Sequence, residues 1–121
     1  DAYLMYAEAV LRGGSGGDLG TALEYVNRVR ERAFGGSTDG HISAGDLTLD
    51  FIIDERAREL LWEAHRRTDL VRFGLFTGDK YLWPWKGNLQ EGRPTDSRYD
   101  LFPIPDSDIN ANPNLSQNPG Y

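Results

Sequence analysis

The sequence predicts an all-α fold made of a tetratricopeptide-like helical hairpin, a long central helix and a long irregular C-terminal segment. Apolar residues recur at helical spacing in three stretches, and glycine pairs follow the first two of them. The segment from residue 77 onward contains the chain's 6 prolines and no periodicity. We therefore expect residues 1–121 to form one region, divided into a hairpin at 1–34, a central helix and turn at 46–76, and an irregular loop and tail at 77–121.

The predicted hairpin rests on two amphipathic stretches. Residues 1–12 place apolar side chains on one helical face and end at Gly13–Gly14. A second stretch starts from Asp18, a suitable N-cap, and keeps helical spacing over residues 18–34. The pair has about the length of a 34-residue tetratricopeptide unit, which needs neighbours to bury its apolar face.

The predicted central helix covers residues 49–66. Thr48 is a suitable N-cap, and apolar residues follow at the spacing of one helical face: Leu49, Ile52, Ile53, Ala57, Leu60, Leu61 and Ala64. Phe51 and Trp62 lie on a second stripe, rotated away from the first. We expect this helix to pack on two sides.

Three carboxylates repeat every fourth residue of the same helix, at Glu55, Glu59 and Glu63. Paired carboxylates can hydrolyse glycosidic bonds. Arginines stand at the neighbouring positions, however, and Glu63 is well placed to pair with Arg67 four residues later. The pattern favours a partly buried ion-pair network over a catalytic pair.

Composition excludes several classes of function. A net charge of −6 and a pI of about 4.8 argue against binding to nucleic acid. The chain has no cysteine, and therefore no disulfide and no thiolate metal site. No apolar run is long enough for a membrane span or a signal peptide. The chain starts without methionine and enters a helical pattern at once, so we expect a fragment of a larger protein.

Two further motifs are incomplete. The glycine-rich loop GGSGGD lacks the Lys-Ser/Thr ending of a phosphate-binding loop. An alternation typical of a calcium loop lacks the required glycine and glutamate and is better read as a polar turn built by Asn-Pro pairs: Asp106, Asp108, Asn110 and Asn112. We expect no cofactor and no bound metal, and the histidines suggest no catalytic triad.

An aromatic cluster in the 77–100 loop is the candidate ligand site. Flat aromatic rings suit the CH-rich faces of sugars, and nearby amides and charges can bind hydroxyl groups. The cluster consists of Tyr81, Trp83 and Trp85, and its polar neighbours are Lys86, Asn88 and Gln90. The alternative is that Trp83-Pro84-Trp85 only anchors the loop onto the helices.

Four blocks of the sequence together resemble the C-terminal part of the SusD/RagB family. They are YLMYAEA near the start, YVNRVRERA in the second predicted helix, Glu55–Gly74 and Leu101–Tyr121. The blocks occur in the family's order and leave out only residues 35–47 and 77–100. The chain departs from the pattern at Trp62, where phenylalanine is usual, and at Ala64, where glycine is usual.

The resemblance implies more than the periodicity does. It implies a longer, all-helical, tetratricopeptide-like lipoprotein of the outer-membrane surface, anchored outside this chain. Such a protein binds an oligosaccharide or polysaccharide without cleaving it and delivers it to a SusC-like TonB-dependent transporter. This portion would mainly be scaffold. The alternative is a helical-repeat module that binds another protein and no sugar.

Overall fold

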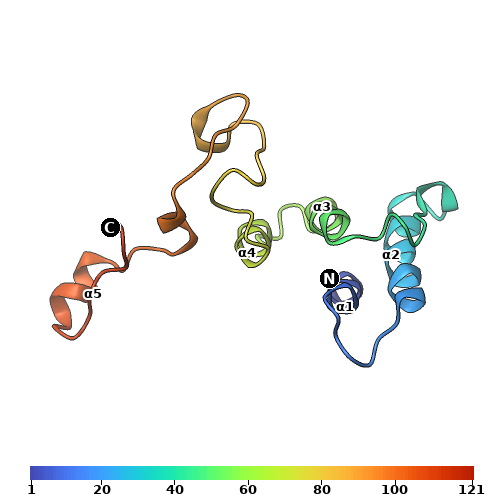
Figure 1. Ribbon diagram of the computed structural model, residues 1–121, viewed down its shortest axis with the longest axis horizontal. Helices are drawn as coiled ribbons and strands as arrows, with labels where there is room; N and C mark the ends of the chain where they lie inside the picture. The colour runs from blue at the N-terminus through green and yellow to red at the C-terminus, as the bar shows by residue number, and fades with distance from the viewer. The chain divides into compact units, whose positions relative to one another are not determined.

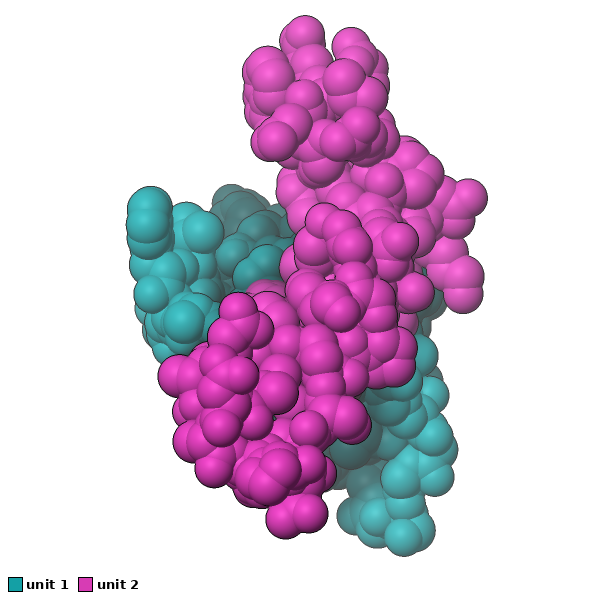
Figure 2. Space-filling view, turned by 90° about the vertical axis from the view of Figure 1, so that its left-hand side faces the viewer, with its two compact units in different colours: residues 1–66 teal, residues 67–121 magenta.

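The structure, a computed structural model, describes residues 1–121 and confirms the all-α class (Figure 1). It has five α-helices and no strand: α1 (Ala2–Leu11), α2 (Leu19–Ala33), α3 (Leu49–Glu59), α4 (Arg66–Arg72) and α5 (Asp106–Ala111). None of these helices has the length and apolar character needed to cross a membrane. The chain divides into two compact units, residues 1–66 and residues 67–121, which Figure 2 colours separately.

Helices α1 and α2 pack as an antiparallel pair in the first unit. The ring of Tyr3 stacks on Tyr25 with centroids 4.4 Å apart, while the Tyr6 hydroxyl accepts a hydrogen bond of 3.3 Å from the backbone of Asp18. Moving from Tyr3 to Tyr6 along α1 thus corresponds to moving from Tyr25 back to Asp18 at the start of α2, as an antiparallel arrangement requires. The core of this unit joins α1, α2 and α3 through side chains that are at most 1% exposed: Leu4, Ala7, Ala22, Val26, Ile52 and Ile53.

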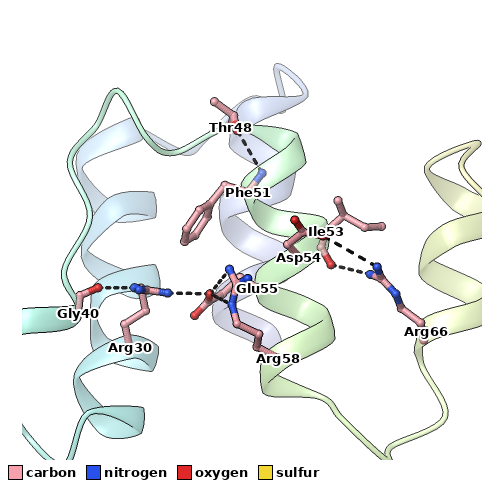
Figure 3. Close-up of polar contacts among 9 residues, drawn as sticks. All are labelled: Arg30, Gly40, Thr48, Phe51, Ile53, Asp54, Glu55, Arg58 and Arg66. Atoms are coloured by element: carbon pink, nitrogen blue, oxygen red, sulfur yellow. Dashed lines mark hydrogen bonds and ion pairs between the residues drawn. The ribbon is translucent and has the colours of Figure 1, made fainter. Parts of the chain in front are cut away.

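The predicted N-caps are confirmed. The Asp18 carboxylate accepts from the backbone N–H of Thr21 at 2.9 Å, and the Thr48 hydroxyl accepts from that of Phe51 at 3.1 Å (Figure 3). Each bond satisfies one of the backbone donors that a helix leaves unpaired in its first turn. Local sequence therefore determines where α2 and α3 begin.

The predicted extent of the central helix is wrong, because α3 ends at Glu59 rather than at residue 66. Trp62 and Ala64 adopt left-handed backbone conformations, with φ of 70° and 60°, which a right-handed helix cannot contain. The turn carries Trp62 to 95% exposure. It also lets Arg66 reach back along α3 and donate to the Ile53 carbonyl at 2.8 Å (Figure 3).

Two expectations about side chains in this region fail for the same reason. The periodic pattern counted Leu61 and Ala64 as core, but both are exposed, Leu61 by 67%. Glu63 lies in the turn between α3 and α4, so it does not share one helix with Arg67 as the prediction required. Only Leu60 of the predicted apolar face beyond Glu59 is buried.

The partly buried ion-pair network is confirmed, with partners from another helix. Glu55 is 4% exposed, and its Oε2 accepts from Arg30 of α2 at 2.8 Å and from Arg58 at 2.9 Å (Figure 3). Glu59 likewise pairs with Arg32 of α2 at 2.5 Å. The carboxylates of α3 therefore bind α2 to α3.

The C-terminal tail is less irregular than predicted, since residues 106–111 form the short helix α5. Elsewhere in the tail, side-chain amides bond to the backbone. The amide of Gln117 pairs with both the N–H and the carbonyl of Ile104 at 2.8 Å, and Asn118 donates to the Phe102 carbonyl at 2.7 Å. Asn112 accepts from the backbone of Asn114 at 3.1 Å. The asparagines of the two Asn-Pro pairs thus make the expected side-chain-to-backbone bonds, but the predicted polar turn over Asp106, Asp108 and Asn110 is wrong, because these residues lie in α5.

Replacing Glu55 by alanine should lower the free energy of unfolding by about 3 kcal/mol, because two arginine partners would lose a buried carboxylate. Urea unfolding followed by circular dichroism measures this. The matched control is Glu24→Ala, which removes an exposed i, i+4 partner of Arg28 and should change stability far less. Equal effects of the two substitutions would contradict the assigned role of Glu55.

Replacing Ala64 by glycine should stabilise the chain by about 1 kcal/mol, because glycine adopts the left-handed conformation without the steric cost that alanine carries. The same substitution at Ala57, inside α3, should instead destabilise it by about 1 kcal/mol. Thermal unfolding of both variants provides the comparison. A loss of stability at both positions would show that the turn at residue 64 is not left-handed.

Candidate functional site

The candidate site lies in the second unit, on a loop closed at its base by one backbone hydrogen bond. The N–H of Gly78 donates to the carbonyl of Thr95 at 2.9 Å. Inside the loop, the N–H of Lys86 donates to the Trp83 carbonyl at 3.0 Å, and that of Arg93 donates to the Lys86 carbonyl at 2.9 Å. These three backbone hydrogen bonds hold the loop, which contains no α-helix and only a short 3-10 helix, Lys86–Asn88.

The side chain of Lys86 occupies the interior of this loop and is 3% exposed. Its ammonium group donates to the carbonyls of Gly78 at 3.1 Å and Tyr81 at 2.8 Å, and it lies 4.7 Å from the centre of the Trp83 ring. Burial lowers the pKa of Lys86 below its usual value, against an opposing effect of the Asp79 and Asp100 charges. A buried cation therefore organises the segment that carries the aromatic residues.

Trp85 stands at the outer end of the loop and is 66% exposed. Its backbone is left-handed, with φ of 70°, and its carbonyl accepts from the N–H of Asn88 at 3.0 Å. Gly87 also has a positive φ, and a Cβ there would lie 2.6 Å from the side chain of Arg93. The tight turn at 85–88 presents the Trp85 ring to solvent.

The three predicted residues do not form one flat platform. The rings of Tyr81 and Trp83 have centroids 6.1 Å apart and are tilted by 49°. Both side chains are partly buried, whereas Trp85 is exposed. Trp83 thus packs on the loop's own Lys86, while the Trp85 ring is exposed to solvent.

A cavity of about 510 Å³ lies beside Trp83, entirely within the second unit. Its walls include residues that the sequence did not indicate as site residues: Arg67, Phe76, Tyr99, Phe102 and Tyr121. The Arg67 guanidinium carbon lies 4.0 Å from the centre of the Phe102 ring and 5.0 Å from that of Phe76. The high aromatic content of the tail was the only sequence signal for this cavity.

Comparison with known proteins adds a likeness over the whole chain. The family model described as "SusD family" matches residues 1–121. The chain is 46% identical over its full length to "Starch-binding protein SusD" of Bacteroides thetaiotaomicron. It is 34% identical over its full length to "SusD-like protein P25" and 40% identical over 83% of its length to "SusD-like protein P2", both of Formosa agariphila. The chain spans 20%, 23% and 21% of the lengths of these three curated relatives.

The buried lysine makes stability depend on pH. Since the pKa of Lys86 is lower in the folded chain than in the unfolded chain, the folded state binds fewer protons between the two values. Its contribution to the free energy of unfolding should therefore rise with pH up to the ordinary value of 10.5. Urea unfolding at a series of pH values, compared with a Lys86→Met variant, isolates this contribution.

The Lys86→Met variant should lack that part of the pH dependence, because methionine carries no titrating group. Lys80→Met, which replaces an exposed lysine of the same loop, is the matched control and should keep it. Parallel pH curves for the unaltered chain and Lys86→Met would rule out a shifted Lys86.

Proposed function

We propose, on the premise that this chain belongs to the SusD family, that it forms part of a longer protein that binds a carbohydrate at the outer-membrane surface. Proteins of this family bind without catalysis. The carboxylates of α3 agree with this, since arginines hold both Glu55 and Glu59. The observation that carries the proposal is the family match over all 121 residues.

Family membership also suggests the wider setting of the protein. We expect a surface-exposed lipoprotein with a tetratricopeptide-like scaffold that passes its ligand to a SusC-like TonB-dependent transporter. The antiparallel pair of α1 and α2 is consistent with such a scaffold. Within the longer protein, residues 1–121 mainly supply scaffold.

Tyr81, Trp83 and Trp85 are the proposed ligand-binding residues of this portion. Trp85 has the exposed ring that can stack on a sugar, and the buried Lys86 fixes the loop that presents it. The exposed side chains of Asn88 and Gln90 lie within a few residues and can bond sugar hydroxyls. The name of the relative from Bacteroides thetaiotaomicron makes starch oligosaccharides the first ligands to test.

A second candidate function is contact with another protein. The turn after α3 exposes Trp62 by 95% and Leu61 by 67%, and both border an apolar hollow of about 450 Å³ in the first unit. Exposed large apolar residues of this kind are typical of protein interfaces. This function requires no sugar.

Replacing Trp85 by alanine should weaken oligosaccharide binding about tenfold, because the sugar loses its stacking surface, equivalent to about 1.4 kcal/mol. Isothermal titration of the longer protein with starch oligosaccharides and a panel of other soluble glycans measures this. Trp62→Ala is the matched control, since it removes another exposed tryptophan that belongs to the first unit.

The titrations distinguish carbohydrate binding at the 77–100 loop from protein contact through Trp62. Unchanged binding in Trp85→Ala would place the sugar site outside this loop and leave residues 77–100 as scaffold. If no glycan of the panel binds the unaltered protein, the carbohydrate function fails and protein contact through Trp62 becomes the better explanation.

A further inference from the structure

The cavity beside Trp83 has the size and lining of a ligand site. Its volume of about 510 Å³ lies within the range of small-molecule pockets, roughly 300–1,000 Å³. Trp83, Tyr99 and Phe102 contribute aromatic rings to its walls, and Pro103 and Leu101 contribute further apolar surface. Such walls suit the flat face of a ring-shaped ligand.

The charged residues of the cavity lining have one sign, although the Asp79 and Asp100 charges act on Lys86 from outside the lining. Arg67 and Lys86 are the charged residues of its lining, and no aspartate, glutamate, asparagine or glutamine contributes to it. Lys86 is almost fully buried and donates to backbone carbonyls rather than to a carboxylate. Arg98 does not line the cavity, but its guanidinium carbon lies 4.9 Å from the centre of the Tyr99 ring, which does.

Hydrogen-bond donors remain available in this lining. The Nη2 of Arg67 donates to the carbonyls of Tyr99 at 2.7 Å and Asp100 at 3.3 Å. Its Nε and Nη1 have no protein partner and are not buried, since no buried side-chain nitrogen or oxygen of the chain lacks a partner. The ammonium of Lys86, in contrast, is buried: it donates to two backbone carbonyls and lies 4.7 Å from the centre of the Trp83 ring.

The side-chain acceptors of the lining are three neutral hydroxyl groups, those of Thr95, Tyr99 and Tyr121. The Tyr121 hydroxyl donates to the carbonyls of Arg98 at 3.2 Å and Leu101 at 3.0 Å, and the Tyr99 hydroxyl accepts from Arg98 at 3.0 Å. A neutral sugar has one hydroxyl proton to donate for each hydroxyl oxygen, and no charged side chain of the lining can accept one. A carboxylate brings acceptors only and is bound best by an arginine with two free nitrogens.

We infer that this cavity binds the carboxylate-bearing ring of an acidic sugar, a uronic acid residue, with Arg67 as its main anion-binding group and Trp83 and Phe102 as ring contacts. The inference rests on the proposed carbohydrate function. It adds that one sugar unit of the bound carbohydrate carries a negative charge. It concerns a second position in the same unit, because Trp85 does not line the cavity. Lys86 contributes positive charge from beneath Trp83.

The test compares an acidic oligosaccharide with its neutral counterpart on the unaltered chain. Isothermal titration with a tetramer of galacturonic acid and with its full methyl ester changes the charge while keeping the rings. The acid should bind at least tenfold more tightly than the ester. Added salt should weaken binding of the acid but leave binding of the ester unchanged. Equal affinity of acid and ester, or no binding of the acid, would overturn the inference.

A matched pair of variants locates the site. Arg67→Met should reduce binding of the acid at least tenfold, whereas Arg93→Met, an exposed arginine of the same unit that does not line the cavity, should not. Because Arg67 also bonds the backbone, circular dichroism must show that the variant folds; otherwise Phe102→Ala replaces it. Equal losses in Arg93→Met would exclude this cavity. Failure here together with retained binding of neutral glycans leaves the proposed function intact.

Discussion

The first unit depends on one buried carboxylate. Glu55 is almost inaccessible to water, so its charge must be balanced within the protein. Arg30 of α2 and Arg58 of α3 both donate to it, and the Arg30 side chain also donates to the carbonyl of Gly40 (Figure 3). Glu55 therefore links α2 to α3 through Arg30, and the same arginine binds the loop between the two helices at Gly40. The centre of the Phe51 ring lies 5.5 Å from the guanidinium carbon of Arg30 and 5.6 Å from that of Arg58.

The helices that the sequence predicted well are those whose determinants are local. Caps at Asp18 and Thr48 and apolar residues at fixed spacing require only near neighbours in the chain. The end of α3 is different. Leu61 and Ala64 continue the apolar period, yet the backbone turns away from them through two left-handed residues that are not glycine. What holds this turn is a bond from Arg66 to a carbonyl of α3, 13 residues back, and periodicity contains no information about such contacts.

The candidate site also combines features that the sequence predicts with features that depend on distant contacts. Clustered aromatic residues indicated the 77–100 loop, because composition is visible in the sequence. The sequence named Lys86 only as a polar neighbour of Tyr81, Trp83 and Trp85, whereas the structure places its ammonium inside the loop. The cavity brings Trp83 together with Arg67 and Tyr121, which lie 16 and 38 residues away in the sequence. Contacts over that separation depend on how the tail folds, and the tail is held by individual side-chain amides rather than by a repeating pattern.

Net charge and local charge lead to different conclusions about ligands. The chain carries a net charge of −6, which argues against long polyanions such as nucleic acids, because these sense the field of the whole surface. A single carboxylate inside a cavity interacts mainly with charged groups within a few ångströms, because solvent and salt screen its interaction with more distant charges. The charged residues that line the cavity beside Trp83 are Arg67 and Lys86, and the Asp79 and Asp100 charges act on Lys86 from outside the lining. An acidic protein can therefore hold a site for an acidic sugar, provided that its own carboxylates are bound elsewhere, as Glu55 is.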